Sequence, residues 1–234
     1  MHIIIPAWFY GFDSLLYMTD AFIGFLLSFY FNRIFTLSSE KRHMYLHLGF
    51  LLFSIGLFTL SVTNAFTYLA FNNCLVSSAT CTLGLLDDVF SLEDFAYFTY
   101  FGLTVFAYIL FLLAYCQEYP KFSRFFIPAF IGYLVLLIAL IPLRDGHVLW
   151  YSYRGYFNMT ALTLLVFVSY KNIVHHIERK TQNSLLVAIS FSFFTLYHVC
   201  HMFSFIGETY VLGHIFMLVG FIALLFMVMR VNKK

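Results

Sequence analysis

The sequence predicts an all-α membrane protein, a bundle of seven transmembrane helices, and three observations indicate this class. Hydrophobic residues make up 62% of the 234 residues and charged residues only 10%, whereas an ordinary soluble domain has roughly 25% charged residues. Seven stretches approach the ~20 apolar residues that a helix needs to cross a bilayer. Basic residues collect on one side of the topology that these stretches define.

The seven expected spans follow one another in a single domain, residues 1–234. We expect helices near 14–36, 44–70, 95–116, 124–143, 153–174, 184–206 and 210–230. Pro120 and Pro142 bracket the fourth span, and proline is tolerated at helix ends because a missing N–H costs little there. Only the connection at 71–94 is long, so a soluble domain has no room between the spans.

The first two spans resemble the fifth and sixth. Each pair consists of an apolar span, a basic turn ("TLSSEKRH" or "HHIERKTQN") and a second apolar span, and "FLLFSIGLF" can be set beside "FSFFTLYHV". With the fourth span as a connector, spans one to three and five to seven run in the same direction, as parallel repeats do. The sequence therefore admits a 3+1+3 parallel repeat.

The basic residues predict the orientation in the membrane, because Lys and Arg beside transmembrane helices stay in the cytoplasm. Every Lys and Arg except Arg144 and Arg154 falls on one side. We therefore expect the N-terminus outside and the C-terminus in the cytoplasm. The net charge of +2 combines a basic inner face with an acidic outer face, so it indicates contact with anionic membrane lipids and gives no case for nucleic-acid binding.

The long outer connection contains Cys74 and Cys81. A disulfide between them would close a small loop in an oxidising compartment. Two free thiols are the alternative, because spacing alone does not establish the geometry that a disulfide needs.

Polar side chains in the spans share one layer in the outer leaflet. Ionisable groups avoid lipid and normally face the bundle or a watery cavity, and depth follows from counting residues inward at about 1.5 Å each. The candidate ligand-binding residues of this layer are Tyr17, Asp20, Asn64, Tyr97, Tyr100, Asn158, His198, His201 and His214. The alternative is a hydrogen-bonded network that only fixes helix packing.

Three of these residues also form a candidate metal site. His198 and His201 are three residues apart on one helix, and His214 lies on the next. A catalytic zinc site uses three protein ligands and keeps one position open for water, and Asp20 could add a fourth ligand or orient one ring. Haem is disfavoured because His201 and His214 lie on neighbouring helices, and retinal because the last span has no lysine for a Schiff base.

The run "NRIFTLSSEKRHMYLHLGFLLFSIGLF", followed by five further spans, resembles the small seven-helix membrane proteins common in archaea. The resemblance covers the whole chain and implies the fold but no particular activity. The His and Asp ligands are also similar to those of seven-helix intramembrane hydrolases such as alkaline ceramidases. The last span, however, lacks the HxxxH pattern of that family.

The composition and the polar layer favour a sensor, a receptor or an accessory subunit that binds a small ligand, an ion or a lipid headgroup. Without a soluble output domain, such a sensor must act on a membrane protein partner. The alternative is a zinc-dependent intramembrane hydrolase, with His198, His201 and His214 as zinc ligands and Asp20 supporting the bound water. A transporter comes third, because the spans lack the Gly/Pro-interrupted pairs that mark many transport sites.

Overall fold

The structure, a computed structural model, is mostly helical across the residues that it describes. These are residues 6–9, 11–76, 92–116, 143–144, 147–148, 150–203 and 206–231. The helices are η1 (Ala7–Phe9), α1 (Phe12–Ser38), α2 (Lys41–Val76), α3 (Leu92–Cys116), α5 (Trp150–Arg179), α6 (Gln182–Met202) and α7 (Gly207–Val231). The strands β1 (Leu143–Arg144) and β2 (His147–Val148) pair antiparallel before α5.

Within the described residues, six helices are long and apolar enough to cross a membrane, so the chain is a multi-pass membrane protein. Five of the predicted spans fall within single helices, namely 14–36, 44–70, 95–116, 153–174 and 210–230. The fourth predicted span, 124–143, lies outside the described residues apart from Leu143. The count of seven helices therefore stays a prediction.

The predicted end of the sixth span at 206 is wrong, because α6 ends at Met202. The Phe203 N–H closes the last turn by donating to Cys200 O at 3.0 Å. The Thr209 hydroxyl then donates to Phe203 O and to Ile206 O, at 2.6 and 2.7 Å. These bonds fix the turn before Glu208, whose carboxylate suits the first turn of α7 because of the helix dipole.

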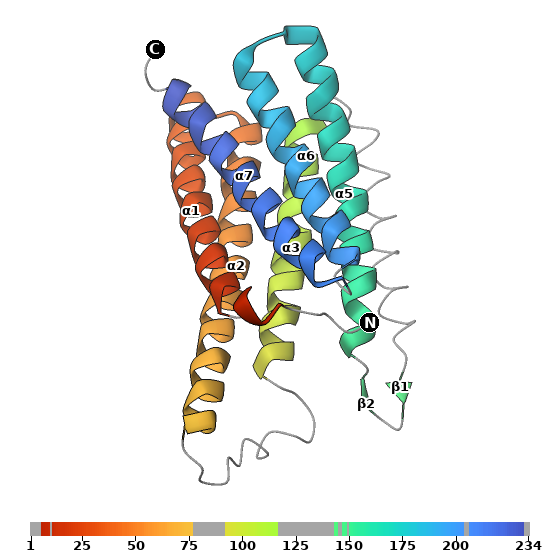
Figure 1. The fold of residues 1–234 in the computed structure, drawn as a ribbon. Helices are drawn as coiled ribbons and strands as arrows, with labels where there is room; N and C mark the ends of the chain where they lie inside the picture. The colour runs from red at the N-terminus through yellow and green to blue at the C-terminus, as the bar shows by residue number, and fades with distance from the viewer. Residues whose placement is uncertain are drawn as a thin grey trace.

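The six long helices form a closed ring in chain order. Each packs against the next, α3 packs against α5, and α7 returns to α1. Figure 1 shows the α1–α2 turn, the α5–α6 turn and the end of α7 at one end of the bundle, which we call the basic end. Its basic residues are Arg33, Lys41, Arg42, Lys171, Arg179, Lys180 and Arg230. The start of α1 and the α6–α7 turn lie at the opposite end.

The two turns at the basic end have the same backbone geometry. Ser39 follows α1 with φ of 57° and Lys180 follows α5 with φ of 50°. Each N–H donates to the carbonyl four residues earlier, Ser39 to Phe35 at 2.8 Å and Lys180 to His176 at 2.7 Å. Ser39 and Lys180 are also equivalent when "FLLFSIGLF" is aligned with "FSFFTLYHV". The two turns are thus alike in backbone geometry, and the 3+1+3 parallel repeat stays a prediction.

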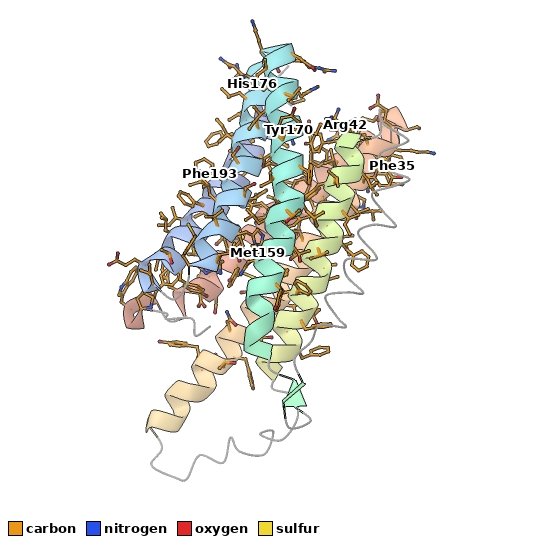
Figure 2. The ribbon with its side chains drawn as sticks, turned by 90° about the vertical axis from the view of Figure 1, so that its right-hand side faces the viewer. Phe35, Arg42, Met159, Tyr170, His176 and Phe193 are labelled. Atoms are coloured by element: carbon orange, nitrogen blue, oxygen red, sulfur yellow. The ribbon has the colours of Figure 1, made fainter. Side chains whose placement is uncertain are left out.

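Large apolar side chains cover the outside of the ring. Met159 and Tyr170 on α5, for example, are 50% and 60% exposed and are labelled in Figure 2. Exposed apolar surface on this scale is expected where lipid, rather than water, surrounds the helices.

Six phenylalanine rings fill the axis of the bundle from its middle toward the basic end. They come from α2, α3, α6 and α7, and none is more than 1% exposed. The members of this phenylalanine cluster are Phe50, Phe53, Phe111, Phe191, Phe194 and Phe221. Neighbouring rings are in contact, with centroids 4.7 Å apart for Phe50–Phe111 and 5.0 Å for Phe194–Phe221. The polar residues of the predicted layer lie beyond this cluster, toward the opposite end, in what we call the polar half.

Candidate binding site in the polar half

His214 lies at the centre of a group of rings where α1, α6 and α7 meet. It is fully buried. Its ring centroid is 4.6 Å from that of Tyr17, 4.7 Å from Tyr210, 5.4 Å from His201 and 5.6 Å from Phe9. Neither of its ring nitrogens has a hydrogen-bond partner among the described residues. The structure thus brings His201 and His214 together on adjacent helices, as the depth count predicts.

Tyr197 joins this group to α3. Its ring packs on His201 with centroids 4.3 Å apart, and its hydroxyl lies 3.2 Å from the hydroxyl of Tyr100. Tyr97 lies at the edge, where its ring contacts Tyr100 and Phe157 at 6.2 and 5.9 Å. Among the predicted residues, Tyr17 and Tyr100 therefore belong to the group around His214, and Tyr97 is peripheral to it.

Asp13 is a member of the site that the sequence analysis missed. It is 5% exposed, and its carboxylate accepts hydrogen bonds from Ser14 N at 2.8 Å and from Asn64 Nδ2 and the Tyr210 hydroxyl, both at 3.3 Å. The predicted Asn64 is thus a partner of Asp13. The available signal was spacing, because Asp13 lies seven residues before Asp20 on the stripe that contains Tyr17.

Asp20 does not reach the histidines, although the sequence suggested that it would. The pairs Asp13–Tyr210, Tyr17–His214 and Gly24–Phe221 have the same spacing along α1 and α7. The two helices therefore run in parallel in a fixed register, which places Asp20 level with Met217, one turn deeper than Tyr17. Asp20 is fully buried, and its carboxylate oxygens have no hydrogen-bond partner within the described ranges.

His198 belongs to a separate network that faces α3 and α5. The Tyr108 hydroxyl lies 2.9 Å from its Nε2, and its Nδ1 lies 3.0 Å from Asn158 Oδ1. If Nδ1–H donates to Asn158, Nε2 accepts the Tyr108 proton, so a neutral imidazole is satisfied on both sides. The predicted residues His198 and Asn158 therefore bond to each other and not to His214.

The predicted zinc ligands gain no support from this geometry. Among the residues that the structure describes, no three His, Cys, Asp or Glu side chains are grouped to hold a metal ion. Both nitrogens of His198 already have partners, so a metal at His198 would replace one of these bonds. The choice between a disulfide and two free thiols concerns Cys74 and Cys81, whose side chains lie outside those described.

The polar half is closed by η1 at the end of the bundle opposite the basic end, and by the phenylalanine cluster on the side of the basic end. Phe9 of η1 is 2% exposed and packs on His214 and Tyr210, whereas its neighbour Trp8 is 73% exposed. Gly11, between η1 and α1, has φ of 85°, a conformation that favours glycine. On the side of the basic end, Phe53 and Phe194 meet across the axis with centroids 6.0 Å apart.

Comparisons of the chain with models of protein families, with curated proteins and with solved structures gave no match.

Proposed function

We propose that the protein is a receptor-like membrane sensor that binds a small polar molecule at His214, between α1, α6 and α7. The observation that carries this proposal is a fully buried imidazole with no partner for either nitrogen in the described part of the chain. Buried polar groups are hydrogen-bonded in the great majority of cases, and leaving one unpaired costs about 1–3 kcal/mol. A ligand that pairs with these nitrogens would recover that free energy on binding.

The surroundings of His214 define the class of ligand. A neutral imidazole offers one donor and one acceptor, so the ligand needs one of each. The rings of Tyr17, Tyr210 and Phe9 favour a flat or aromatic body. The nearby Asp13 carboxylate, bonded to Tyr210, disfavours an anion. We therefore expect a small neutral or cationic molecule with a flat body.

Phe9 controls access to this site. Its ring lies over His214 and Tyr210, at the end of the bundle predicted to face outside. Gly11 supplies a position where the backbone can turn, because glycine accepts φ values that other residues rarely adopt. Movement of η1 about Gly11 would open a path from the outer surface to His214.

The phenylalanine cluster favours a sensor over a transporter. Its six rings are buried and in mutual contact, so they offer no polar groups to a solute that moves along the axis toward the basic end. A ligand that enters from the polar half would stop at this cluster. Binding without passage is the behaviour of a receptor.

The position of the site suggests how binding would be transmitted. Tyr17 and His214 face each other where the ring closes between α1 and α7. A ligand inserted there would bind better to a bundle with these two helices slightly apart, and would shift the population toward that form. A membrane protein partner resting on α1 or α7 could then respond.

A thermal-shift screen tests the proposal. The purified protein in detergent would be heated with a panel of small aromatic amines, alcohols and amides. We expect one class to raise the unfolding temperature, because a molecule that binds only the folded state stabilises it by about 2.7 kcal/mol at a hundred times its Kd. The shift should disappear in His214→Phe and persist in Phe226→Leu, a change on the exposed face of α7.

Two results would contradict the proposal. A stabilising compound that acts equally on the wild type and on His214→Phe binds elsewhere. A panel without any effect, together with ordered water on both His214 nitrogens in an experimental structure, would leave a water-filled packing site instead of a receptor.

A further inference from the structure

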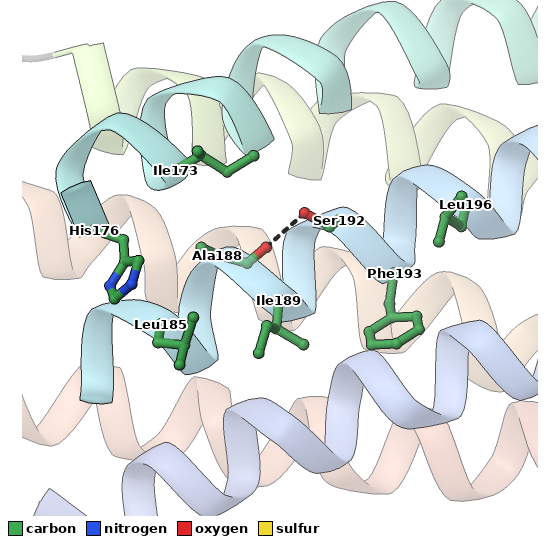
Figure 3. A pocket seen from close by; sticks show the side chains of 8 residues that line it. All are labelled: Ile173, His176, Leu185, Ala188, Ile189, Ser192, Phe193 and Leu196. Carbon is green, nitrogen blue, oxygen red and sulfur yellow. Dashed lines mark hydrogen bonds between the residues drawn. The ribbon is translucent and has the colours of Figure 1, made fainter. Parts of the chain in front are cut away.

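A second candidate site lies on the outer surface of the bundle, between α5 and α6 and near the basic end. It is an apolar groove with a volume of about 290 Å³, shown in Figure 3. Its lining residues are Ile173, His176, Leu185, Ala188, Ile189, Ser192, Phe193 and Leu196. The groove is open to the surrounding membrane, because Ile173, Leu185 and Leu196 are 42%, 40% and 40% exposed.

Two of the polar groups that line the groove are already bonded to the protein. The Ser192 hydroxyl donates to the Ala188 carbonyl at 2.9 Å, and His176 Nδ1 lies 3.0 Å from the Ser184 hydroxyl. Apart from His176 Nε2, what remains along the groove is aliphatic and aromatic surface. It is therefore suited to a hydrocarbon chain and not to a polar solute.

The length of the groove matches one leaflet. It extends along α6 from Leu185 to Leu196, which corresponds to about 16 Å at a rise of about 1.5 Å per residue. The hydrocarbon core of a bilayer is about 30 Å thick. The groove therefore runs from near the membrane surface at the basic end to about the bilayer midplane, the depth that a single acyl chain occupies.

Positive charge lies where the groove meets the membrane surface. Arg179 ends α5 and Lys180 forms the turn to α6, and both side chains are exposed. Glu178 is the one acidic side chain between His176 and Ser184, so the turn carries a net positive charge. Basic residues at this position attract the phosphate of anionic lipids.

We propose that this groove binds one anionic phospholipid, with an acyl chain between α5 and α6 and its phosphate against Arg179 and Lys180. The apolar lining suits an acyl chain, and the length of the groove matches the depth of one leaflet. The positive charge of the turn suits an anionic headgroup. The groove is separate from the site at His214. His214 faces the inside of the ring, near the end of the bundle opposite the basic end.

Native mass spectrometry of the delipidated protein tests this site. Phosphatidylglycerol and phosphatidylcholine with the same acyl chains would be added in equal amounts. We expect one phosphatidylglycerol to bind roughly tenfold more tightly than phosphatidylcholine, since anionic headgroups are attracted by basic residues near the surface. Arg179→Gln combined with Lys180→Asn should abolish this preference, and asparagine suits the left-handed backbone at Lys180.

A groove-filling variant separates the acyl chain from the headgroup. Ser192→Phe should weaken the binding of both lipids about equally, because it occupies space that both acyl chains need. Ser192→Ala removes the same hydroxyl without filling the groove and should bind as the wild type does. Val219→Phe and Arg230→Gln, on the exposed face and at the basic end of α7, are matched controls that should change nothing.

Three outcomes would overturn the proposal. The first is equal binding of the two lipids by the wild type. The second is an equal loss in the Arg230→Gln control, which would indicate general attraction to the basic end. The third is a protein dimer that Ser192→Phe disrupts, because a second copy would then occupy the groove. If Ser192→Phe fails to fold, the charge variants alone decide.

Discussion

The phenylalanine cluster and the polar half fill the same axis and are equally buried, but they differ in whether their side chains need hydrogen-bond partners. The rings of the phenylalanine cluster have no polar atoms, so close packing satisfies them completely. The polar half contains His214 and Asp20, whose polar atoms have no partner in the described residues, beside His198 and Asp13, which are fully engaged. The first region is therefore satisfied by packing alone, whereas the second contains polar atoms whose hydrogen-bonding capacity is unused within the described residues.

The first test of this comparison asks which side of the membrane the polar half faces. The expected labelling is all or none. A cysteine at Trp8, which is 73% exposed, should react with a membrane-impermeant maleimide in intact cells. A cysteine at Lys180 should react only after permeabilisation, because basic turns stay in the cytoplasm. The reverse pattern would turn the polar half toward the cytoplasm.

Truncation of a central ring should have the largest effect on stability. Phe194 is fully buried and contacts Phe53, Phe191 and Phe221. We expect Phe194→Ala to lower the free energy of unfolding by about 3–5 kcal/mol, because it leaves a cavity. Thermal unfolding in detergent measures this change. Phe226→Ala, at a residue 57% exposed, should have little effect, and a similar loss in both variants would contradict the role of the cluster.

The two aspartates of α1 should respond in opposite directions. Asp13→Leu leaves Asn64 and Tyr210 without their acceptor, and we expect a loss of about 1–3 kcal/mol in the free energy of unfolding. Asp20→Leu removes a carboxylate without a described partner and should increase stability, because an unpaired polar group inside a membrane span is costly. Destabilisation by Asp20→Leu would show that Asp20 has a partner after all.

Substitution of His198 and of His214 should also change the free energy of unfolding differently, but by a smaller amount. His198→Phe deprives Tyr108 and Asn158 of a partner and should lower stability by about 1–2 kcal/mol. His214→Phe breaks no hydrogen bond to a described residue, so in the absence of ligand it should be neutral or slightly stabilising. Chemical denaturation of both variants provides the comparison, and equal losses would remove the distinction between the two sites.

The sequence predicted the six described spans and the approximate depth of most of the polar layer, but not which residues share a network. Composition located five spans within single helices, and counting from the α6–α7 turn placed His201 beside His214. His198 lies about 60° around α6 from His201. In a ring where α6 stands between α5 and α7, this angle is enough to direct it to Asn158 and Tyr108. Depth alone carries no information on that angle.

The register between α1 and α7 was the second quantity that counting residues inward from the helix ends could not predict. Asp20 and His214 were predicted at one level, yet the parallel packing of α1 on α7 pairs Tyr17 with His214 and leaves Asp20 one turn deeper. That register depends on close contacts such as Gly24 against Ser54 and Phe221, which arise only in the folded bundle. The role of Asp13 was missed because the first span was expected to start at residue 14.

Chemical modification of the two buried histidines tests the central claim most directly, namely that Phe9 covers a His214 imidazole whose nitrogens have no partner in the described residues. Diethyl pyrocarbonate reacts with unprotonated imidazole nitrogens, and peptide mass spectrometry reports each histidine separately. We expect His214 to react several-fold faster in Phe9→Ala than in the wild type, whereas His198, which is bonded on both nitrogens, stays protected in both. Equal protection of His214 in the two proteins, or equal reactivity of His198 and His214 in Phe9→Ala, would contradict the account.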